Sequence, residues 1–184
     1  MNYIYQPSDD SYLLEKQIKR FARGKSFLDM GAGSGVQSLA AKSAHAKSIL
    51  ACDINSKSVA HLKSLGINSI KSNLFSKIKG KFDVIAFNPP YLPLDKREPK
   101  LSQLSTTGGR YGDEVLIKFI KQLPAHLNPD GFALIVVSSL TPINKILFLL
   151  KKLNLKHEIL SSKKLFMEEL FAWKINQKAL DFGL

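Results

Sequence analysis

Apolar and polar positions along this chain follow two alternating patterns. Stretches with apolar residues three and four positions apart predict helices over residues 8–21, 36–44, 55–65, 113–123 and 142–153. Between them, short apolar runs predict strands over residues 26–30, 48–53, 67–72, 81–86, 132–138, 157–161 and 170–175. Because predicted strands and helices alternate, we expect an α/β fold built on an open sheet.

Two connections depart from this alternation. Only residues 162–169 join the last two predicted strands, which is too short for a crossover helix, so we expect an antiparallel hairpin there. Residues 92–107 are polar and contain proline, and we expect a mobile, functional loop. Its basic residues Lys96, Arg97 and Lys100 either contact a substrate or are simply solvated.

The most informative stretch is Asn88-Pro89-Pro90-Tyr91, which follows the predicted strand 81–86. The two prolines cannot continue a ladder of hydrogen bonds and keep the backbone extended, at the end of the strand where ligands sit in open α/β sheets. The Asn88 side chain and the Pro89 carbonyl then offer acceptor oxygens beside the flat ring of Tyr91. This arrangement suits a planar amino group, which belongs to adenine, to cytosine or to the amide of Gln or Asn. The alternative is a plain proline turn that closes a strand.

A glycine-rich segment follows the first predicted strand. Residues 31–35 read Gly-Ala-Gly-Ser-Gly and lead directly into a predicted helix, as in nucleotide-binding sites. The spacing is not the one expected for a dinucleotide pyrophosphate. Asp29, two residues earlier, would repel a phosphate but favour a cation. The segment therefore favours S-adenosylmethionine, which carries an ammonium and a sulfonium, over NAD.

Two polar residues follow the next strands. Asp53 lies about 20 residues after the glycines, where an acid usually binds ribose hydroxyls. The alternative is that Asp53 caps the following helix. Asn73 is placed to contact the adenine amine, with apolar neighbours around the ring; the alternative is an ordinary loop asparagine.

Composition bounds the class of protein. The chain has 184 residues with 45% hydrophobic and 23% charged content, and we expect one globular domain over residues 1–184. No apolar run approaches the ~20 residues of a membrane span, and residues 1–10 do not resemble a secretory signal. The single cysteine, Cys52, excludes an internal disulfide and fits a cytoplasmic location. The histidines are too scattered to predict a metal site.

The formal net charge of +12 concerns partners rather than fold. It permits binding to nucleic acid, or to a protein that is itself bound to nucleic acid. Most of the excess is lysine, however, whereas specific readers of phosphates and bases favour arginine. A solvated, lysine-rich surface explains the charge equally well.

Taken in order, these segments resemble the class I S-adenosylmethionine-dependent methyltransferases. The matching parts are Asp-x-Gly-x-Gly-x-Gly at residues 29–35, the acid Asp53, and Asn-Pro-Pro-Tyr at residues 88–91. The last motif marks the amino-methylating branch. Residues 5–14 and the Gly-Gly-Arg-Tyr-Gly segment at residues 108–112 are similar to segments of the archaeal and eukaryotic HemK-like protein-glutamine methyltransferases.

The resemblance implies a fold and a set of site residues. The fold is a Rossmann-like seven-stranded sheet with an antiparallel last strand and helices on both faces. The implied catalytic residues are Asn88, Pro89, Pro90 and Tyr91. The implied residues for binding S-adenosyl-L-methionine are Ser11, Asp29, Gly31, Ala32, Gly33, Gly35, Asp53, Ile54, Asn73, Leu74 and Asn88. The chain departs from the family at Asn73, where aspartate is common.

The resemblance also implies a substrate and a partner. The subgroup methylates the glutamine of the Gly-Gly-Gln motif in class I translation release factors. Its members work with a small zinc-binding activator protein, paired along the sheet edge near the third strand. Three alternatives remain open: an RNA or DNA methyltransferase acting on base amines, a protein-lysine methyltransferase, and a non-catalytic protein that only binds the cofactor.

Overall fold

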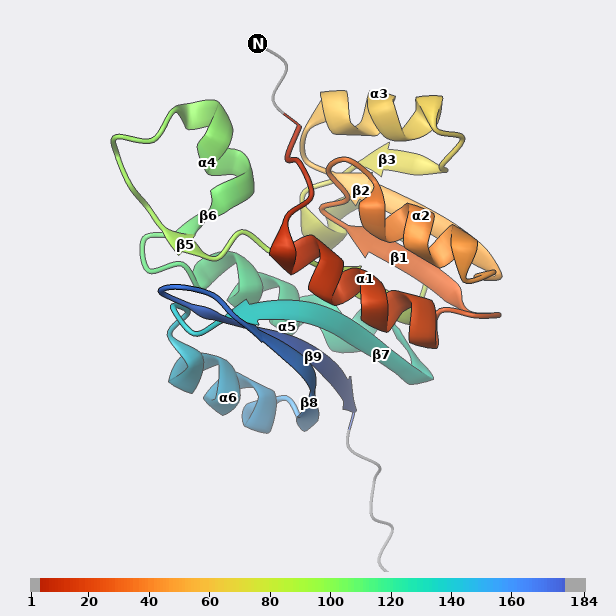
Figure 1. The fold of residues 1–184 in the computed structure, drawn as a ribbon. Helices are drawn as coiled ribbons and strands as arrows, with labels where there is room; N and C mark the ends of the chain where they lie inside the picture. The colour runs from red at the N-terminus through yellow and green to blue at the C-terminus, as the bar shows by residue number, and fades with distance from the viewer. Residues whose placement is uncertain (1–3, 178–184) are drawn as a thin grey trace, which may run out of the picture.

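The computed structural model describes residues 4–177, except for the side chain of Leu101. Helices and strands alternate along most of the chain (Figure 1). The helices are α1 (Asp9–Phe21), α2 (Val36–Ser43), α3 (Ser56–Ser64), the 3-10 helix η1 (Leu74–Lys77), α4 (Lys100–Thr106), α5 (Glu114–His126) and α6 (Ile143–Lys152). The strands are β1 (Ser26–Met30), β2 (Ser48–Asp53), β3 (Ser69–Lys71), β4 (Phe82–Phe87), β5 (Leu92–Pro93), β6 (Thr107–Gly109), β7 (Leu127–Ser138), β8 (Leu155–Lys164) and β9 (Glu169–Gln177).

A seven-stranded sheet forms the centre of the molecule, in the order β3-β2-β1-β4-β7-β9-β8. Neighbouring strands from β3 to β7 are parallel, whereas β9 is antiparallel to both β7 and β8. The predicted Rossmann-like sheet and the predicted final hairpin are both confirmed. The order reverses between β1 and β4, which is where open α/β sheets bind ligands, beyond the carboxyl ends of the strands.

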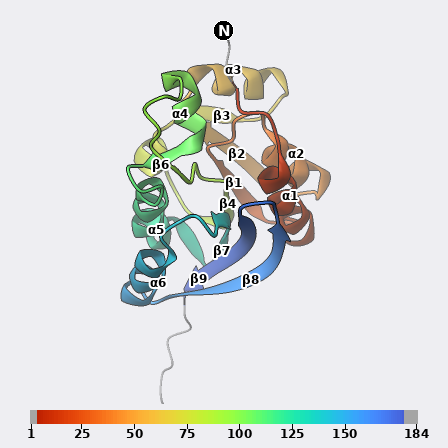
Figure 2. The same ribbon diagram turned by 60° about the vertical axis from the view of Figure 1, so that its left-hand side comes forward.

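Helices cover both faces of this sheet. In Figure 2, α1 and α2 lie on one side of the central strands, and α5 and α6 lie on the other. Alternation along β1 explains the two layers, since successive side chains of a strand point to opposite faces. Phe27 packs in the cluster that includes Leu14 and Ile18 of α1, whereas Leu28 packs in the cluster that includes Phe119 of α5. The central strands are thus buried on both faces, as parallel strands usually are.

The prediction of a long loop over residues 92–107 is wrong. This segment contains β5 and α4 and ends at β6, which pairs in parallel with β5. The Glu98 side chain organises α4, because it accepts hydrogen bonds from the hydroxyl groups of Ser102 and Thr106 at the two ends of the helix. The segment is therefore an ordered flap rather than a structureless loop.

Residues 128–131, Asn-Pro-Asp-Gly, lie inside β7, although the predicted strand began only at residue 132. Phe82 pairs with Leu127 and Val84 pairs with Phe132, so the residues between these two pairs bulge out of the ladder. None of the helices within residues 4–177 has the length and apolar content needed to cross a bilayer.

Candidate active site

A cavity of about 460 Å³ opens at the carboxyl ends of β1, β2 and β4. It is bounded by the glycine loop, the segment that follows β4, the start of α1, and the flap that carries α4. Its lining residues are Tyr5, Asp10, Ser11, Met30, Gly31, Ala32, Gly33, Ser34, Val36, Gln37, Asp53, Ile54, Asn55, Ser58, Ser72, Asn73, Leu74, Phe87, Asn88, Pro89, Pro90, Tyr91, Leu92, Gln103, Leu104, Ser105, Thr106, Thr107, Val115 and Lys118.

The four residues Asn88, Pro89, Pro90 and Tyr91 all line this cavity, directly after β4. The side-chain oxygen Oδ1 of Asn88 is buried and has no hydrogen-bond partner among the described residues. A buried acceptor without a donor costs about 1–3 kcal/mol, so a ligand that supplies a hydrogen-bond donor would bind favourably here. Burial also raises the pKa of the Tyr91 hydroxyl above its ordinary value. Residues 88–91 are called the catalytic corner below.

Two glycines pack against the backbone of this corner. A Cβ at Gly108 would lie 2.6 Å from the carbonyl oxygen of Pro90, and one at Gly112 would lie 2.4 Å from that of Tyr91. The backbone amide of Leu94 donates to the carbonyl oxygen of Gly109 at 2.9 Å and joins the same segments. Only glycine permits this approach. The sequence showed the Gly-Gly-Arg-Tyr-Gly segment but not what it supports.

The glycine loop follows β1 with three left-handed residues, at φ +63° for Gly31, +52° for Gly33 and +87° for Gly35. Gly31 also faces the Phe87 ring, 3.2 Å from where its Cβ would lie. Gly31, Ala32 and Gly33 line the cavity, as expected. Gly35 does not line it, because Gly35 is the N-cap of α2 and faces Leu62 instead.

Asp53 ends β2 and holds the glycine loop in place. Its Oδ2 accepts from the backbone amide of Gly33 at 2.8 Å, and its Oδ1 accepts from that of Asn55 at 2.7 Å. Burial raises the pKa of its carboxyl group. The alternative interpretation, that Asp53 caps the next helix, is wrong, because Asn55 is the N-cap of α3 and accepts from the amide of Lys57. Asp53 and the neighbouring Ile54 both line the cavity.

The structure places Asp29 differently from our expectation. The Asp29 side chain is buried and does not line the cavity. Its carboxylate accepts a hydrogen bond of 2.6 Å from the Ser38 hydroxyl, because strand alternation turns it toward the layer of α1 and α2. Burial raises the pKa of Asp29 to about 7. Asp29 therefore does not face the cavity. Its hydrogen bond with Ser38 instead joins the end of β1 to the first turn of α2, on either side of the glycine loop.

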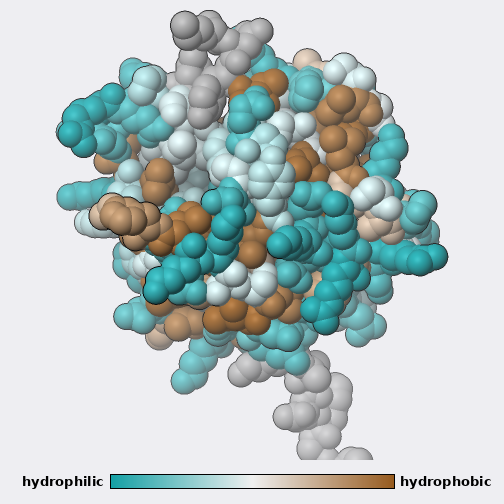
Figure 3. All heavy atoms as spheres, viewed as in Figure 1, coloured by the Kyte–Doolittle hydropathy of each residue, from teal (hydrophilic) through white to brown (hydrophobic). Residues whose placement is uncertain are grey.

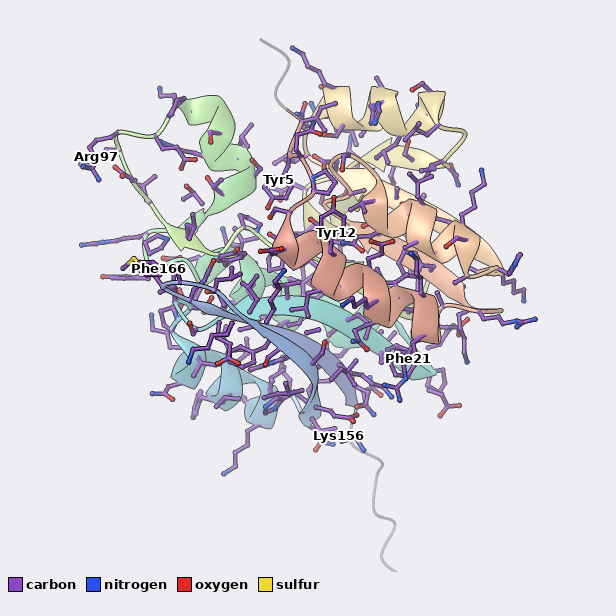
Figure 4. All side chains as sticks on the ribbon, viewed as in Figure 1. Tyr5, Tyr12, Phe21, Arg97, Lys156 and Phe166 are labelled. Atoms are coloured by element: carbon purple, nitrogen blue, oxygen red, sulfur yellow. The ribbon has the colours of Figure 1, made fainter. Side chains whose placement is uncertain are left out.

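The chain before α1 closes another side of the cavity. The Tyr5 hydroxyl donates to Asp10 at 2.8 Å, and the Ser11 hydroxyl donates to the same carboxylate at 3.0 Å. Figure 4 labels Tyr5 above the start of α1. Gln37 of α2 donates through Nε2 to the Ser11 carbonyl at 3.0 Å. Ser11 was expected here, whereas Tyr5 and Gln37 were missed, because their contacts join segments far apart in sequence.

Asn73 and Leu74 line the far end of the cavity, together with Val115 and Lys118 of α5. The Asn73 side chain is exposed, and Leu74 has a left-handed backbone with φ +47°. Such strain in a residue with a Cβ is uncommon and gathers at functional sites. The two residues lie where the sequence placed them, between β3 and α5.

Comparison with known proteins identifies the family. The family model described as "Methyltransferase small domain" matches residues 9–167. A Methanocaldococcus jannaschii protein described as a candidate protein N5-glutamine methyltransferase is 39% identical, over 94% of this chain and 92% of its own length. Methyltransferase HEMK2 of Mus musculus is 31% identical, over 76% of this chain and 74% of its own.

A solved structure has the same fold. It is the E. cuniculi Mtq2–Trm112 complex, described as responsible for the methylation of the eRF1 translation termination factor. The TM-score is 0.78 at 24% sequence identity, over 95% of this chain and 99% of the other.

The cavity fits the cofactor of this family. It has a glycine-lined wall that a Cβ would narrow and an acid at the end of β2. The chain belongs to the methyltransferase small domain family and is an S-adenosyl-L-methionine-dependent methyltransferase.

Proposed function

We propose that this enzyme methylates the side-chain amide nitrogen of a glutamine, in the Gly-Gly-Gln motif of a class I translation release factor. The single observation that carries the proposal is the buried, unpartnered Oδ1 of Asn88 at the wall of the cavity. A primary amide supplies the N–H donor that this oxygen lacks. The names of the relatives point to the same chemistry.

The corner orients the amide for transfer. Asn88 Oδ1 and the Pro89 carbonyl accept the two N–H bonds, and Tyr91 lies against the flat group. Bound S-adenosyl-L-methionine supplies an electrophilic methyl group on its sulfonium. As the amide nitrogen takes the methyl group and becomes positive, its hydrogen bonds to Asn88 and Pro89 strengthen, which stabilises the transition state more than the ground state. The nitrogen then releases one of its two protons to the solvent, which gives the neutral N-methyl amide. Fixing the nitrogen in line with the methyl group supplies most of the remaining rate.

The other cavity residues hold the cofactor. Asp53 binds the ribose hydroxyls, with Ile54 beside them. Asn73 and Leu74 contact the adenine, while Ser11 and the backbone of Gly31–Gly33 enclose the methionine end. Asp29 and Gly35 act indirectly, by fixing the start of α2. Asn73 can hydrogen-bond the adenine amine as an aspartate would, although without the charge, so we expect weaker binding rather than loss.

A partner protein belongs to the proposal. We infer that a small zinc-binding activator pairs with the enzyme along the edge of the sheet at β3. The described neighbour is a complex of two proteins, Mtq2 and Trm112, which supports this inference. Among the strands of residues 4–177, β3 is the outermost on its side of the sheet, so no other described strand covers the edge that such a partner would use.

Methylation of an RNA base amine is a second candidate. The net charge of +12 favours it, because such a surface attracts phosphates. An exocyclic amine would satisfy Asn88 as well as an amide does, but the base would have to be flipped out or single-stranded.

Labelled cofactor separates these candidates. The enzyme, with the activator present, is incubated with a class I release factor, with bulk RNA and with DNA, and the modified residue is located by mass spectrometry. Label on the Gly-Gly-Gln glutamine, absent when that glutamine is replaced by glutamate, is the expected result. Label on nucleic acid or on a lysine would overturn the proposal.

A further inference from the structure

Two large apolar side chains project from the turn between β8 and β9. Phe166 is 100% exposed and Met167 is 81% exposed. Figure 4 labels Phe166 at the tip of this hairpin, and Figure 3, in the same view, shows apolar atoms projecting there. Single exposed apolar residues are ordinary, but two adjacent ones that are exposed to this extent on a hairpin tip add little to the core.

The turn that carries them is held rigidly at both ends. The backbone amide of Leu165 donates to the Glu168 carbonyl at 2.8 Å, and the Leu165 side chain packs against a core cluster. The Glu168 carboxylate accepts from the Ser138 hydroxyl at 2.7 Å, and the Ser139 amide donates to the Glu169 carbonyl at 2.8 Å. The two side chains between these anchors are therefore presented on a fixed support, which lowers the entropy lost when a partner binds.

The tip lies at the same end of the sheet as the catalytic corner. β8 runs parallel to β7, and β7 runs parallel to β4, so all three end at the edge where Asn88 lies. Tyr91 packs against the same core cluster as Leu165. The support of the tip is thus continuous with the wall of the active site.

A third apolar residue lies beside the tip. Leu140 is 48% exposed and follows Ser139, whose side chain accepts from the Glu169 amide at 2.9 Å. Phe166, Met167 and Leu140 are called the tip patch below. Aromatic residues and methionine are enriched at protein interfaces and make large contributions there. Of the two lysines before the tip, Lys163 is paired with Asp9 of α1 and Lys164 is exposed, so the tip patch is apolar with a cation at its margin.

We propose that the tip patch is a docking surface for the polypeptide substrate and binds apolar side chains of the folded protein that carries the acceptor glutamine. This rests on the proposed function, since it requires a protein substrate. A glutamine that reaches Asn88 brings its flanking chain past Tyr91, and the tip patch lies next along that edge. Recognition therefore extends beyond the amide itself.

A double variant tests the tip patch. Phe166→Ser with Met167→Ser removes the two most exposed side chains without touching the cavity. The matched control is Phe148→Ser on α6, which is 71% exposed and lies outside the patch. With the activator present, we expect the KM for a release factor to rise about tenfold or more in the double variant, as for loss of an interface hot spot. The kcat at saturating substrate and the affinity for S-adenosyl-L-methionine stay at wild-type values, and Phe148→Ser changes neither.

Other results of this experiment would refute the docking surface alone, or the docking surface together with the proposed function. If wild-type enzyme methylates the release factor and the double variant has the same KM, the docking surface is refuted and the proposed function stands. An equal rise in KM for Phe148→Ser refutes it too, since the effect is then not specific to the patch. A shift of only the double variant from dimer to monomer in gel filtration would assign the patch to a second copy of the chain. If the wild-type enzyme methylates only nucleic acid, both proposals fail.

Discussion

A Cβ added at Gly108 would lie 2.6 Å from the carbonyl oxygen of Pro90, closer than real Cβ contacts come. The glycine segment that ends the flap therefore serves as the back wall of the catalytic corner. The two prolines make the corner stiff, but they do not determine where it lies. Its position depends on backbone-to-backbone packing that only glycine allows, so residues remote in sequence control the geometry of Asn88.

Replacing Gly108 by alanine is expected to displace the corner. The neighbouring atoms are backbone atoms of Pro90 and Gly112, which cannot move aside cheaply. Such crowding costs about 1–3 kcal/mol in stability. We expect the methyl-transfer rate of Gly108→Ala to fall at least about tenfold, because a small misplacement of the acceptors is costly, while the affinity for the cofactor changes little. Single-turnover kinetics and calorimetry check the two expectations.

Gly131 provides the matched control. A Cβ there would lie 2.7 Å from the Phe82 carbonyl oxygen, at the opposite end of β4. Gly131→Ala is expected to lower the melting temperature as Gly108→Ala does, but to leave the transfer rate of the folded enzyme unchanged. Equal loss of rate in both variants would mean that crowding anywhere in the fold impairs transfer, and that Gly108 has no special relation to the corner.

Much of the fold followed from the sequence because its signals are local. Short apolar runs located the strands of the main sheet, and apolar residues at helical spacing located the helices that cover it. The short connection after β8 indicated the hairpin. The helix α4 was missed because its organising contact, Glu98 with Ser102 and Thr106, is a set of side-chain hydrogen bonds without apolar periodicity. Residues 128–131 read as a turn and do leave the ladder, but β7 continues on both sides of them.

The site was harder to predict, because contacts between distant segments decide it. Asn88 and Asp53 were placed at the carboxyl edge by the strands before them, and both line the cavity. Which way Asp29 points depends on the face of β1 to which it belongs, and the glycine motif alone does not specify that face. The contact of Gln37 with Ser11 joins α2 to α1, which no spacing in the sequence indicates.

The raised pKa of Asp29 makes stability depend on pH. Burial raises this pKa from 3.8 to about 7 in the folded protein. Between these values the folded state keeps a proton that the unfolded state releases, so stability falls as pH rises, by at most about 1.4 kcal/mol per pH unit from this group. Urea unfolding from pH 4 to pH 8 should show this decline in the wild-type enzyme and a flatter profile in Asp29→Asn. A wild-type profile that rises over this interval, unchanged in Asp29→Asn, would contradict it. Asp53, whose pKa is also raised, contributes in the same direction and stays in both proteins.

Cys52 is expected to be chemically inert in the folded enzyme. Its side chain is fully buried and donates to the Met30 sulfur at 3.4 Å, and burial raises its pKa to about 12. The thiolate is the reactive form, so iodoacetamide at pH 8 should label the native enzyme far more slowly than enzyme unfolded in urea, as followed by mass spectrometry. Rapid labelling of the native protein would show that β2 opens on that timescale.

The central claim is that Asn88 orients the acceptor amide while other residues hold the cofactor. Asn88→Ala tests it most directly, in an assay that measures single-turnover methyl transfer to the release factor and cofactor affinity by calorimetry on the same preparation. Removing one preorganised hydrogen-bonding group at a reacting centre costs about 10²–10³ in rate. We predict a loss of that size in transfer with a dissociation constant for S-adenosyl-L-methionine close to the wild-type value. Equal losses of transfer and of cofactor affinity, or transfer at the wild-type rate, would contradict the account.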